Sequence, residues 1–300
     1  MAEESQSVIV NFAPTGMVPT KTMTPHVPLS VSEIVEDVHA AWEMGITIVH
    51  LHARDPATGA PTTSPDVFGE LIGGIRAFAP DLVVCASLSG RTVQDLEPRA
   101  APLMLEDDLK PDMGSLTLGS VDFSRQTSVN DLSAIRGLAG RMQTRGVLPE
   151  LEVFDVGMIN TARYLIGRGL LEPPYYFNLF FGNICGVQAD LLHAGLMLRD
   201  LPEASYWSFA GVGDCQVQMN AMAIAAGGGI RVGIEDSIFY DRKRSRFTRN
   251  IELLTRTHRI AEAMEREIMK PAELRHRLRL REGHGNYGRV AGGKVVADNP

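Results

Sequence analysis

The sequence is poor in cysteine. It holds only three, Cys85, Cys185 and Cys215, which is an odd number without CxxC spacing. That pattern does not indicate a disulfide framework and is typical of a reducing compartment. A chain of 300 residues can also bury a core large enough to be stable without disulfide or metal staples.

Long apolar runs are missing as well. The most apolar stretch, residues 219–230, contains three consecutive glycines and is too short for a membrane span. The N-terminal residues MAEESQS are polar and acidic, and they lack the basic and apolar regions of a signal peptide. We therefore expect a cytoplasmic protein.

Positive charge is outnumbered, because 29 Lys and Arg stand against 36 Asp and Glu, which gives a formal net charge of −7 at pH 7. A nucleic-acid-binding surface needs clustered Lys and Arg to neutralise phosphates, so the balance argues against nucleic acid as a partner. One basic cluster, Arg242-Lys243-Arg244, is followed by Arg246 and Arg249. It is short and mixed with polar residues, and we interpret it as a solvated face.

With 44% hydrophobic and 22% charged residues, the chain has the composition of an ordinary globular protein. Short β-branched runs alternate with helical patterns. The helical patterns include 31–44, which Ser30 precedes and Glu33 supports as a capping box, together with 191–201 and 251–264. The predicted strands are 8–10, 46–52, 82–88, 113–118, 151–154, 175–181, 206–211 and 230–235.

Eight strand–helix alternations predict a single (β/α)8 TIM barrel over residues 1–300. A doubly wound open sheet is the alternative, but it normally has fewer strands, and no GxGxxG follows the first run. The segment from about residue 271 is polar with mixed charge. We expect this C-terminal extension to pack on the barrel or on a neighbouring subunit.

Active sites of such barrels lie at the C-terminal ends of the strands, where His50 and His52 end the second predicted strand. Residues two apart on a strand share a face, so both imidazoles point the same way. This pair predicts half of a zinc-type site; two structural histidines bonded to backbone carbonyls are the alternative. Glu235, at the end of the eighth strand, would complete a set of two histidines and one glutamate with open coordination positions.

Further acidic and basic residues occupy the same strand ends. Arg231 lies four residues before Glu235 and on its face, whereas Asp236 can reach the site only if the strand bends. Glu150 and Glu152 lie on the fifth strand. Arg231, Asp236 and Glu152 are consistent with a tuned general base or with a plain ion-pair network.

Small hydroxyl residues end the third and fourth strands. The segment CASLSG, with Ser87 and Gly90 at its end, forms a turn that can offer N–H and O–H groups to an anion; an ordinary βα turn is equally consistent. Ser115 and Thr117 end the fourth strand.

Five segments resemble the β-keto acid cleavage enzymes, a family of zinc-dependent (β/α)8 barrels. They occur in the family's order from the first strand to the eighth, so the resemblance covers nearly the whole chain. The segments are APTG (13–16), HLHARD (50–55), PDMGSLTLGSVDF (111–123), PELEVFDVGM (149–158) and GGIRVGIEDSIFY (228–240).

The resemblance implies a role for each matching residue. The zinc ligands would be His50, His52 and Glu235. The base would be Asp236, supported by Arg231 and Glu152. The substrate carboxylate would be held by Ser87, Gly90, Ser115 and Thr117.

One position departs from the family pattern. Members that act on 3-keto-5-aminohexanoate carry an acidic residue two positions after the TG of the first strand, where this chain has Val18. A buried ammonium beside valine would be unpaired, at a cost of several kcal/mol. We therefore expect a β-keto acid with a neutral or apolar tail, and the apolar residues Phe12, Met17 and Phe180 favour the same tail.

The implied reaction condenses a β-keto acid with acetyl-CoA to give acetoacetate and a new acyl-CoA. The resemblance also implies a homotetramer. Two other functions stay open: a metal-dependent aldolase or lyase that works without coenzyme A, and a non-catalytic ligand-binding barrel.

Overall fold

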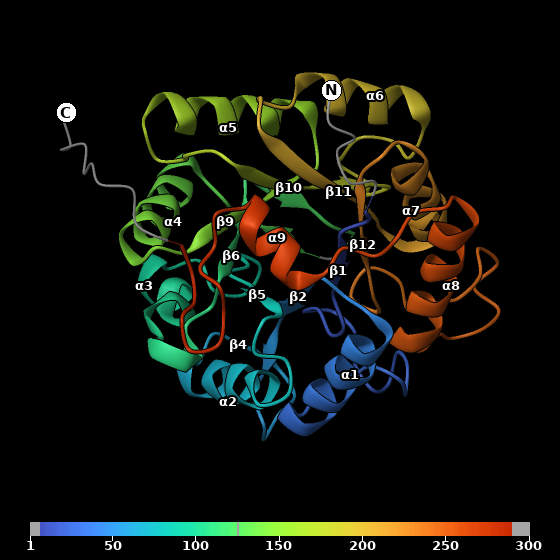
Figure 1. The fold of residues 1–300 in the computed structure, drawn as a ribbon, viewed down its shortest axis with the longest axis horizontal. Helices are drawn as coiled ribbons and strands as arrows, with labels where there is room; N and C mark the ends of the chain where they lie inside the picture. Colours follow the sequence, from blue (N-terminus) through green and yellow to red (C-terminus); the bar gives the residue numbers. More distant parts are fainter. Residues whose placement is uncertain (1–6, 125, 290–300) are drawn as a thin grey trace.

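The computed structural model describes residues 7–124 and 126–289. Its central feature is a closed barrel of parallel strands in the order β1-β12-β11-β10-β9-β6-β5-β2 (Figure 1). The predicted (β/α)8 barrel is therefore confirmed. The barrel strands are β1 (Val10–Phe12), β2 (Ile48–Leu51), β5 (Val83–Ala86), β6 (Met113–Thr117), β9 (Leu148–Val153), β10 (Tyr175–Phe181), β11 (Ser205–Gly211) and β12 (Gly229–Val232).

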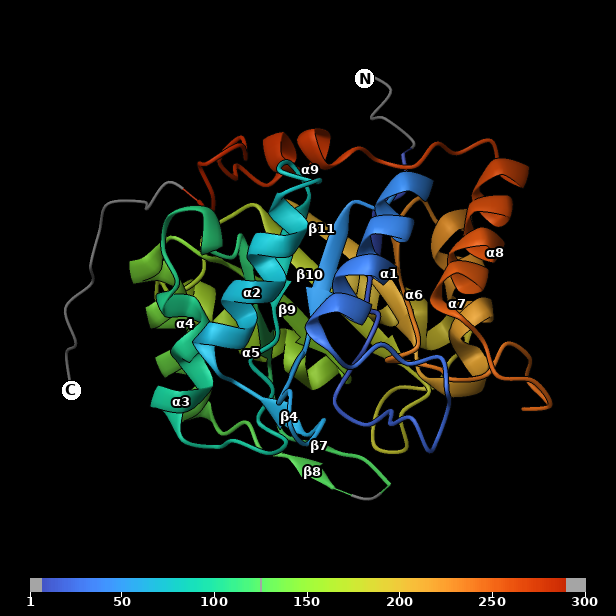
Figure 2. The same ribbon diagram turned by 90° about the horizontal axis from the view of Figure 1, so that it is seen from below.

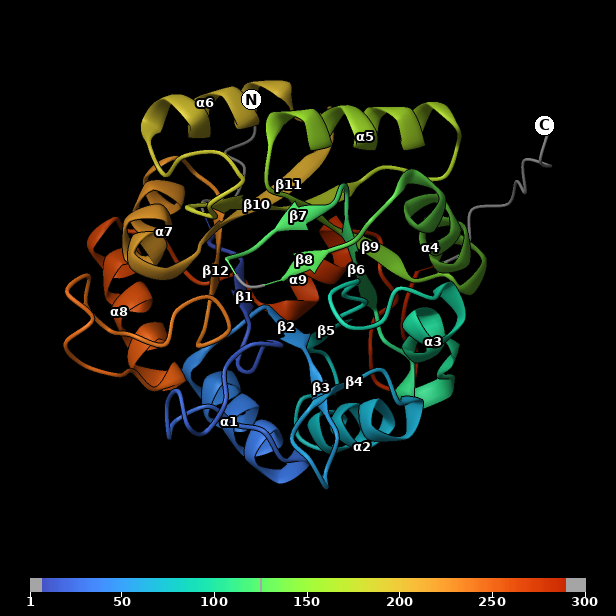
Figure 3. The ribbon, with the colours of Figure 1, turned by 180° about the vertical axis from the view of Figure 1, so that it is seen from behind.

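Helices surround the barrel on all sides (Figure 3). The capping box predicted at Ser30 is present, because the Ser30 hydroxyl accepts from the Glu33 N–H and the Glu33 carboxylate accepts from the Ser30 N–H. The surrounding helices are α1 (Val31–Met44), α2 (Pro65–Arg76), α3 (Leu96–Ala100), α4 (Leu132–Arg145), α5 (Val156–Gly167), α6 (Leu191–Asp200), α7 (Gln216–Ala225) and α8 (Asn250–Ala263).

Seven of the eight barrel strands differ from their predicted bounds, by up to three residues at either end, and two of these differences lie at the strands that flank the site. The first strand begins at Val10 rather than Val8, which instead forms an isolated bridge with Ile268. The eighth strand ends at Val232 rather than at residue 235. A Cβ at Gly233 would lie 1.9 Å from the Ala13 carbonyl oxygen, so the glycine allows the chain to turn closely against the segment that follows β1.

The C-terminal end of the barrel carries two short hairpins. They are formed by β3 (Ala53–Arg54) with β4 (Pro61–Thr62), and by β7 (Val121–Asp122) with β8 (Thr127–Ser128). Figure 3 views the molecule from this end and shows β7 and β8 in front of the barrel.

The opposite, N-terminal end is covered by α9 (Pro271–Arg277) (Figures 1 and 2). Leu274 and Leu278 belong to an apolar cluster with inward residues of the barrel, among them Ile48 and Val83. Burying such side chains contributes about 1.5–3 kcal/mol each. No helix in the described ranges is long and apolar enough to cross a membrane.

Candidate active site

The two histidines of the second barrel strand lie side by side, as their spacing predicts. His50 belongs to β2 and His52 follows it directly, with the ring centroids 5.1 Å apart. His52 Nε2 is 3.1 Å from Glu235 Oε1, so a contact across the barrel mouth joins β2 to the loop after β12. The ligand atoms of His50, His52 and Glu235 all lie within 4.8 Å of one another.

This trio offers free donor atoms to a metal ion. His50 Nε2 and Glu235 Oε2 are buried and have no hydrogen-bond partner. Buried polar atoms are normally paired, so these two unpaired atoms make the trio a candidate ligand set. Imidazole nitrogens with one carboxylate oxygen form a donor set that zinc accepts, and the residues therefore fit such an ion.

A second group, His50 with Cys85 and Glu150, also brings possible ligand atoms together. Its geometry is explained without an ion, because the Cys85 thiol donates to Glu150 Oε2 at 3.2 Å. Burial raises the pKa of the Cys85 thiol well above its usual range, and the Glu150 charge raises it further. We therefore take the trio with His52 as the candidate metal site.

Glu150 itself is the residue that sequence reasoning left without a role. It is fully buried, and its carboxylate lies 2.5 Å from His50 Nδ1 and accepts from Asn11 Nδ2 at 2.6 Å. Burial alone would raise the pKa of Glu150, but His50, Arg231 and Asn11 lower it to about 2. A carboxylate bonded to one ring nitrogen directs the other nitrogen to a metal and raises its basicity.

One feature of the sequence could have indicated a role for Glu150, namely its position two residues before Glu152. That spacing on β9 places both side chains on the inward face of the barrel. Glu152 accepts a hydrogen bond from Thr117 Oγ1 at 2.6 Å. Burial and the neighbouring Glu150 raise the pKa of Glu152, against the lowering effect of His50 and Arg231.

Asp236 reaches the site because the chain bends after β12. The N–H groups of Asp236 and Ser237 both donate to the Gly233 carbonyl, so the backbone leaves the extended conformation. Arg231 then donates through Nη2 to Glu235 Oε1 at 2.6 Å and through Nε to Asp236 Oδ2 at 3.1 Å. Burial raises the pKa of Asp236 to about 6, with Arg231 opposing the rise.

The APTG turn after β1 packs against the Glu235 side chain. Gly16 has φ +68°, and a Cβ there would lie 2.6 Å from the Glu235 Cγ. Only glycine satisfies both conditions. The turn therefore packs closely against the Glu235 side chain.

The predicted carboxylate-binding residues divide into two pairs. Ser87 and Thr117 line the main cavity at this end of the barrel. Ser115 Oγ instead accepts from the Leu88 N–H at 2.9 Å, and a Cβ at Gly90 would meet the Val129 carbonyl at 2.3 Å. Ser115 and Gly90 thus shape the loop after β5, and neither lines the cavity.

The main cavity has a volume of about 790 Å³, large enough for a small molecule. Val18 lies on its wall and is 44% exposed, whereas Phe12 is fully buried in the core and does not line the wall. The candidate metal-ligand and acid–base residues on the wall are His52, Glu152, Arg231, Glu235 and Asp236. Its apolar part includes Met17, Met23, Phe154 and Phe180.

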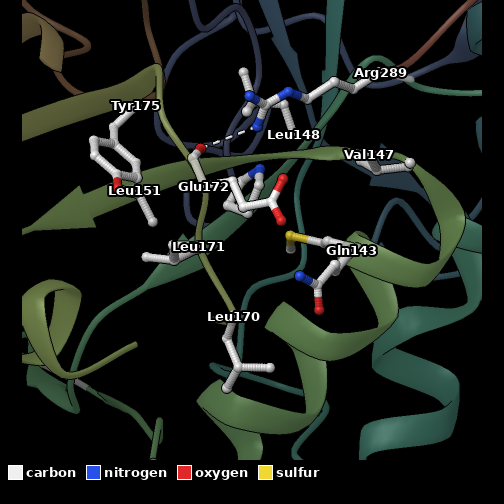
Figure 4. A pocket seen from close by; sticks show the side chains of 12 residues that line it. Gln143, Val147, Leu148, Leu151, Leu170, Leu171, Glu172, Tyr175 and Arg289 are labelled. Carbon is white, nitrogen blue, oxygen red and sulfur yellow. Dashed lines mark hydrogen bonds between the residues drawn. The ribbon is translucent and has the colours of Figure 1, made fainter. Parts of the chain in front are cut away.

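A second, far smaller cavity of about 40 Å³ lies beside β9 and β10 (Figure 4). Leu148, Leu151 and Tyr175 line it, and Arg289 closes one side by donating to the Glu172 carbonyl at 3.0 Å. Among the residues that the structure describes, it contains no cluster of titratable groups comparable to that of the main cavity. We therefore place the candidate active site at the C-terminal end of the barrel.

Fold and site together define a (β/α)8-barrel enzyme with a buried centre of two histidines and a carboxylate beside an arginine-held acid. The comparison with known families agrees: the family described as beta-keto acid cleavage enzyme matches residues 7–280. The chain belongs to this family.

Two curated relatives resemble this chain over almost their full length. The 3-keto-5-aminohexanoate cleavage enzyme of Fusobacterium nucleatum is 36% identical over 280 residues, which is 92% of this chain and 99% of that protein. The 3-oxoadipate:acetyl-CoA acetyltransferase of Cupriavidus necator is 33% identical, over 92% of this chain and 96% of that protein. Among solved structures, apo ObcA superimposes with a TM-score of 0.70 at 20% identity, over 85% of this chain and 65% of ObcA, a likeness of fold.

Proposed function

We propose that this protein is a zinc-dependent enzyme that condenses a β-keto acid with acetyl-CoA and releases acetoacetate and a new acyl-CoA. One observation carries the proposal: unpaired buried donor atoms of His50 and Glu235 converge beside His52, next to an acid held by Arg231. The names of the relatives from Fusobacterium nucleatum and Cupriavidus necator support both the substrate class and the thioester partner.

The zinc ion would be held by His50 Nε2, His52 Nε2 and the Glu235 carboxylate. When bound, such an ion supplies Lewis-acid polarisation of a ketone oxygen and fixes its orientation. Glu150 holds the His50 ring through Nδ1, which leaves Nε2 as the nitrogen available to the ion.

Asp236 is the proposed base. It lies on the cavity wall, and the Arg231 Nε–H fixes one of its oxygens. It takes a proton from the carbon between the ketone and the carboxylate of the substrate. That carbon then attacks the acetyl carbonyl of the thioester, and coenzyme A leaves as a thiolate.

The second half of the reaction breaks the original bond. The thiolate adds to the substrate's own ketone carbon, and the bond from this carbon to the former methylene breaks. The products are the acyl-CoA and, once the proton has returned, acetoacetate. Glu152 accepts a hydrogen bond from Thr117, and its charge acts on Arg231. Together with Arg231 it positions Asp236 during both proton transfers.

The substrate carboxylate would contact Ser87 and Thr117, with Ser115 and Gly90 fixing the loop behind them. Val18 and the apolar wall formed by Met17, Phe154 and Phe180 favour a neutral or apolar tail. Higher turnover of 3-keto-5-aminohexanoate than of neutral β-keto acids would contradict this choice of tail.

The test is a screen of the purified protein against β-keto acids with acetyl-CoA, with acetoacetate release and bound zinc as readouts. Cleavage that needs no acetyl-CoA would identify an aldolase or lyase instead. The absence of turnover with every β-keto acid would favour a ligand-binding barrel. A homotetramer, expected from the family resemblance, is tested in the same preparation by light scattering.

A further inference from the structure

The cavity contains a guanidinium group that no described residue neutralises. Arg91 lies in the loop after β5 and lines the cavity. It forms no ion pair within the described residues, and its Nε is buried without a hydrogen-bond partner. Its Cζ lies 3.9 Å from the centroid of the Phe123 ring, so the ring holds one face of the guanidinium plane.

Other buried arginines in the structure are used differently. Arg99 donates to the Leu88 carbonyl and to the Asn130 side chain, and Arg275 donates to both oxygens of Asp112. Arg231, which shares the cavity with Arg91, already binds Glu235 and Asp236. Arg91 is therefore the cavity cation that is not committed to a protein acid.

The surroundings of Arg91 hold it in place without satisfying its charge. Phe123 packs edge-on against Phe154, with ring centroids 5.8 Å apart, and Gln126 donates to the Arg91 carbonyl. Burial lowers the pKa of Arg91, although the charges of Glu235 and Glu152 oppose the effect. A partly desolvated cation without a partner is costly, and an incoming anion would remove that cost.

We propose that Arg91 binds a carboxylate or phosphate group of a bound substrate through its unpaired N–H groups. Stacking on Phe123 fixes the plane of the guanidinium, and the planar fork matches two oxygens of such an anion. The proposal rests on the proposed function, which brings two anionic molecules to this cavity. The group is either the carboxylate of the β-keto acid or a phosphate of coenzyme A.

Binding measurements distinguish the substrate carboxylate from a coenzyme A phosphate, and they do not require turnover. Calorimetric titration of the metal-loaded protein with acetoacetate, coenzyme A and pantetheine, which lacks phosphates, is carried out on the wild type, Arg91→Gln and Arg91→Lys. We expect Arg91→Gln to weaken acetoacetate or coenzyme A by about 10- to 100-fold, the range of a charge-assisted hydrogen bond. Arg91→Lys restores only part of the loss, because an ammonium group cannot form the two-pronged contact.

Arg256→Gln is the matched control. Arg256 also stacks on an aromatic ring, with its Cζ 4.5 Å from the Tyr240 centroid, but it does not line the cavity. Its substitution leaves all three affinities within about twofold of the wild type, as expected for a site outside the cavity.

The outcomes are distinct. Weaker acetoacetate binding alone assigns Arg91 to the substrate carboxylate, and weaker coenzyme A binding with unchanged pantetheine binding assigns it to a phosphate. Changes below twofold for both anions in Arg91→Gln overturn the proposal, as does the absence of binding of both to the wild type. A wild type that binds these probes but releases no acetoacetate from β-keto acids refutes the proposed function alone.

Discussion

At the N-terminal end of the barrel, Asp112 is fully buried with Arg76 and Arg275. Its carboxylate also accepts from the N–H groups of Val84 and Gly288. Burial would raise the pKa of Asp112, but the two arginines lower it below its usual value. We call this acid and its two arginines the lower cluster. The Asp112 carboxylate is fully hydrogen-bonded within the protein, and of the cluster's side-chain polar atoms Arg76 Nε is buried without a partner.

At the C-terminal end, the charged groups of the active site form a second cluster, which we call the upper cluster. Several of its buried polar atoms have no hydrogen-bond partner. His50 Nε2, Glu235 Oε2 and Arg231 Nη1 are all buried without a partner, and Arg91 lacks a counter-ion among the described residues. Complete buried networks make a structure rigid, whereas unpaired buried groups are costly and need a reason. We infer that the lower cluster stabilises the fold, and we propose that the upper cluster binds an ion and a substrate.

The largest effect is expected from removing a metal ligand at the upper end. His52→Ala should lower zinc content and reduce kcat by on the order of 10³-fold or more, because Lewis-acid stabilisation is worth several kcal/mol. Metal analysis and initial rates measure both effects. Full zinc occupancy in this variant would remove His52 from the ligand set.

Removing the proposed base should separate turnover from metal binding. Asp236→Asn is expected to reduce kcat by about 10²- to 10⁴-fold, the usual contribution of a general base, with zinc retained. Glu152→Gln should act in the same direction. Either residue leaves the mechanism if its variant turns over at the wild-type rate.

A substitution in the lower cluster should lower the free energy of unfolding and leave the activity unchanged. Asp112→Asn leaves Arg76 and Arg275 buried without their acid, which costs about 3–5 kcal/mol of unfolding free energy. Urea denaturation measures this loss, and kcat per folded molecule should stay unchanged. Asp108→Ala, an exposed neighbour, is the control and should change stability by less than about 0.5 kcal/mol. A loss of kcat without a loss of stability in Asp112→Asn would reverse the assignment of the two ends.

Asp37 provides a pH-dependent test near the upper end. Burial raises its pKa from 3.8 to about 6, although the Asn250 amide donates to it. Because the folded pKa lies above the unfolded one, the native state loses stability as pH rises from about 4 to about 6. Asp37→Asn should remove that loss and add at most about 3 kcal/mol at pH 8, with little change at pH 4. Urea titrations at both pH values measure it; equal effects at both would refute the shift.

The smallest effect concerns the cavity wall. Val18→Glu should move the kcat/KM preference toward β-keto acids with a cationic tail by about fivefold, because a half-exposed ion pair contributes no more than about 1 kcal/mol. Competition between 3-keto-5-aminohexanoate and a neutral substrate measures the preference. Val18→Gln has a similar size without the charge and should show no such shift.

Much of the site was predictable because local periodicity controls it. The two-residue spacing of His50 and His52 places them on one face whatever surrounds them, and Glu152 follows the same rule on β9. The Ser30 and Glu33 capping box likewise depends only on residues three apart. Alternating strand and helix patterns were enough to predict the closed barrel.

Other features depend on contacts between distant segments. Asp236 reaches Arg231 only because Gly233 allows a turn against Ala13, and a regular strand would point it away. Glu150 acquires its role from His50, one hundred positions earlier in the chain. Ser115 turns to the Leu88 N–H, although its spacing alone would place it with Thr117.

By itself, the sequence determined the barrel and the shared face of His50 and His52, because hydrophobic period and strand pleat act over a few residues. Tertiary structure alone decided which buried groups find partners. Asp112 meets two arginines at one end of the barrel, whereas Arg91 Nε, His50 Nε2 and Glu235 Oε2 find no hydrogen-bond partner among the described residues at the other. Pairing depends on which loops the closed barrel brings within hydrogen-bond distance, and no local pattern encodes that.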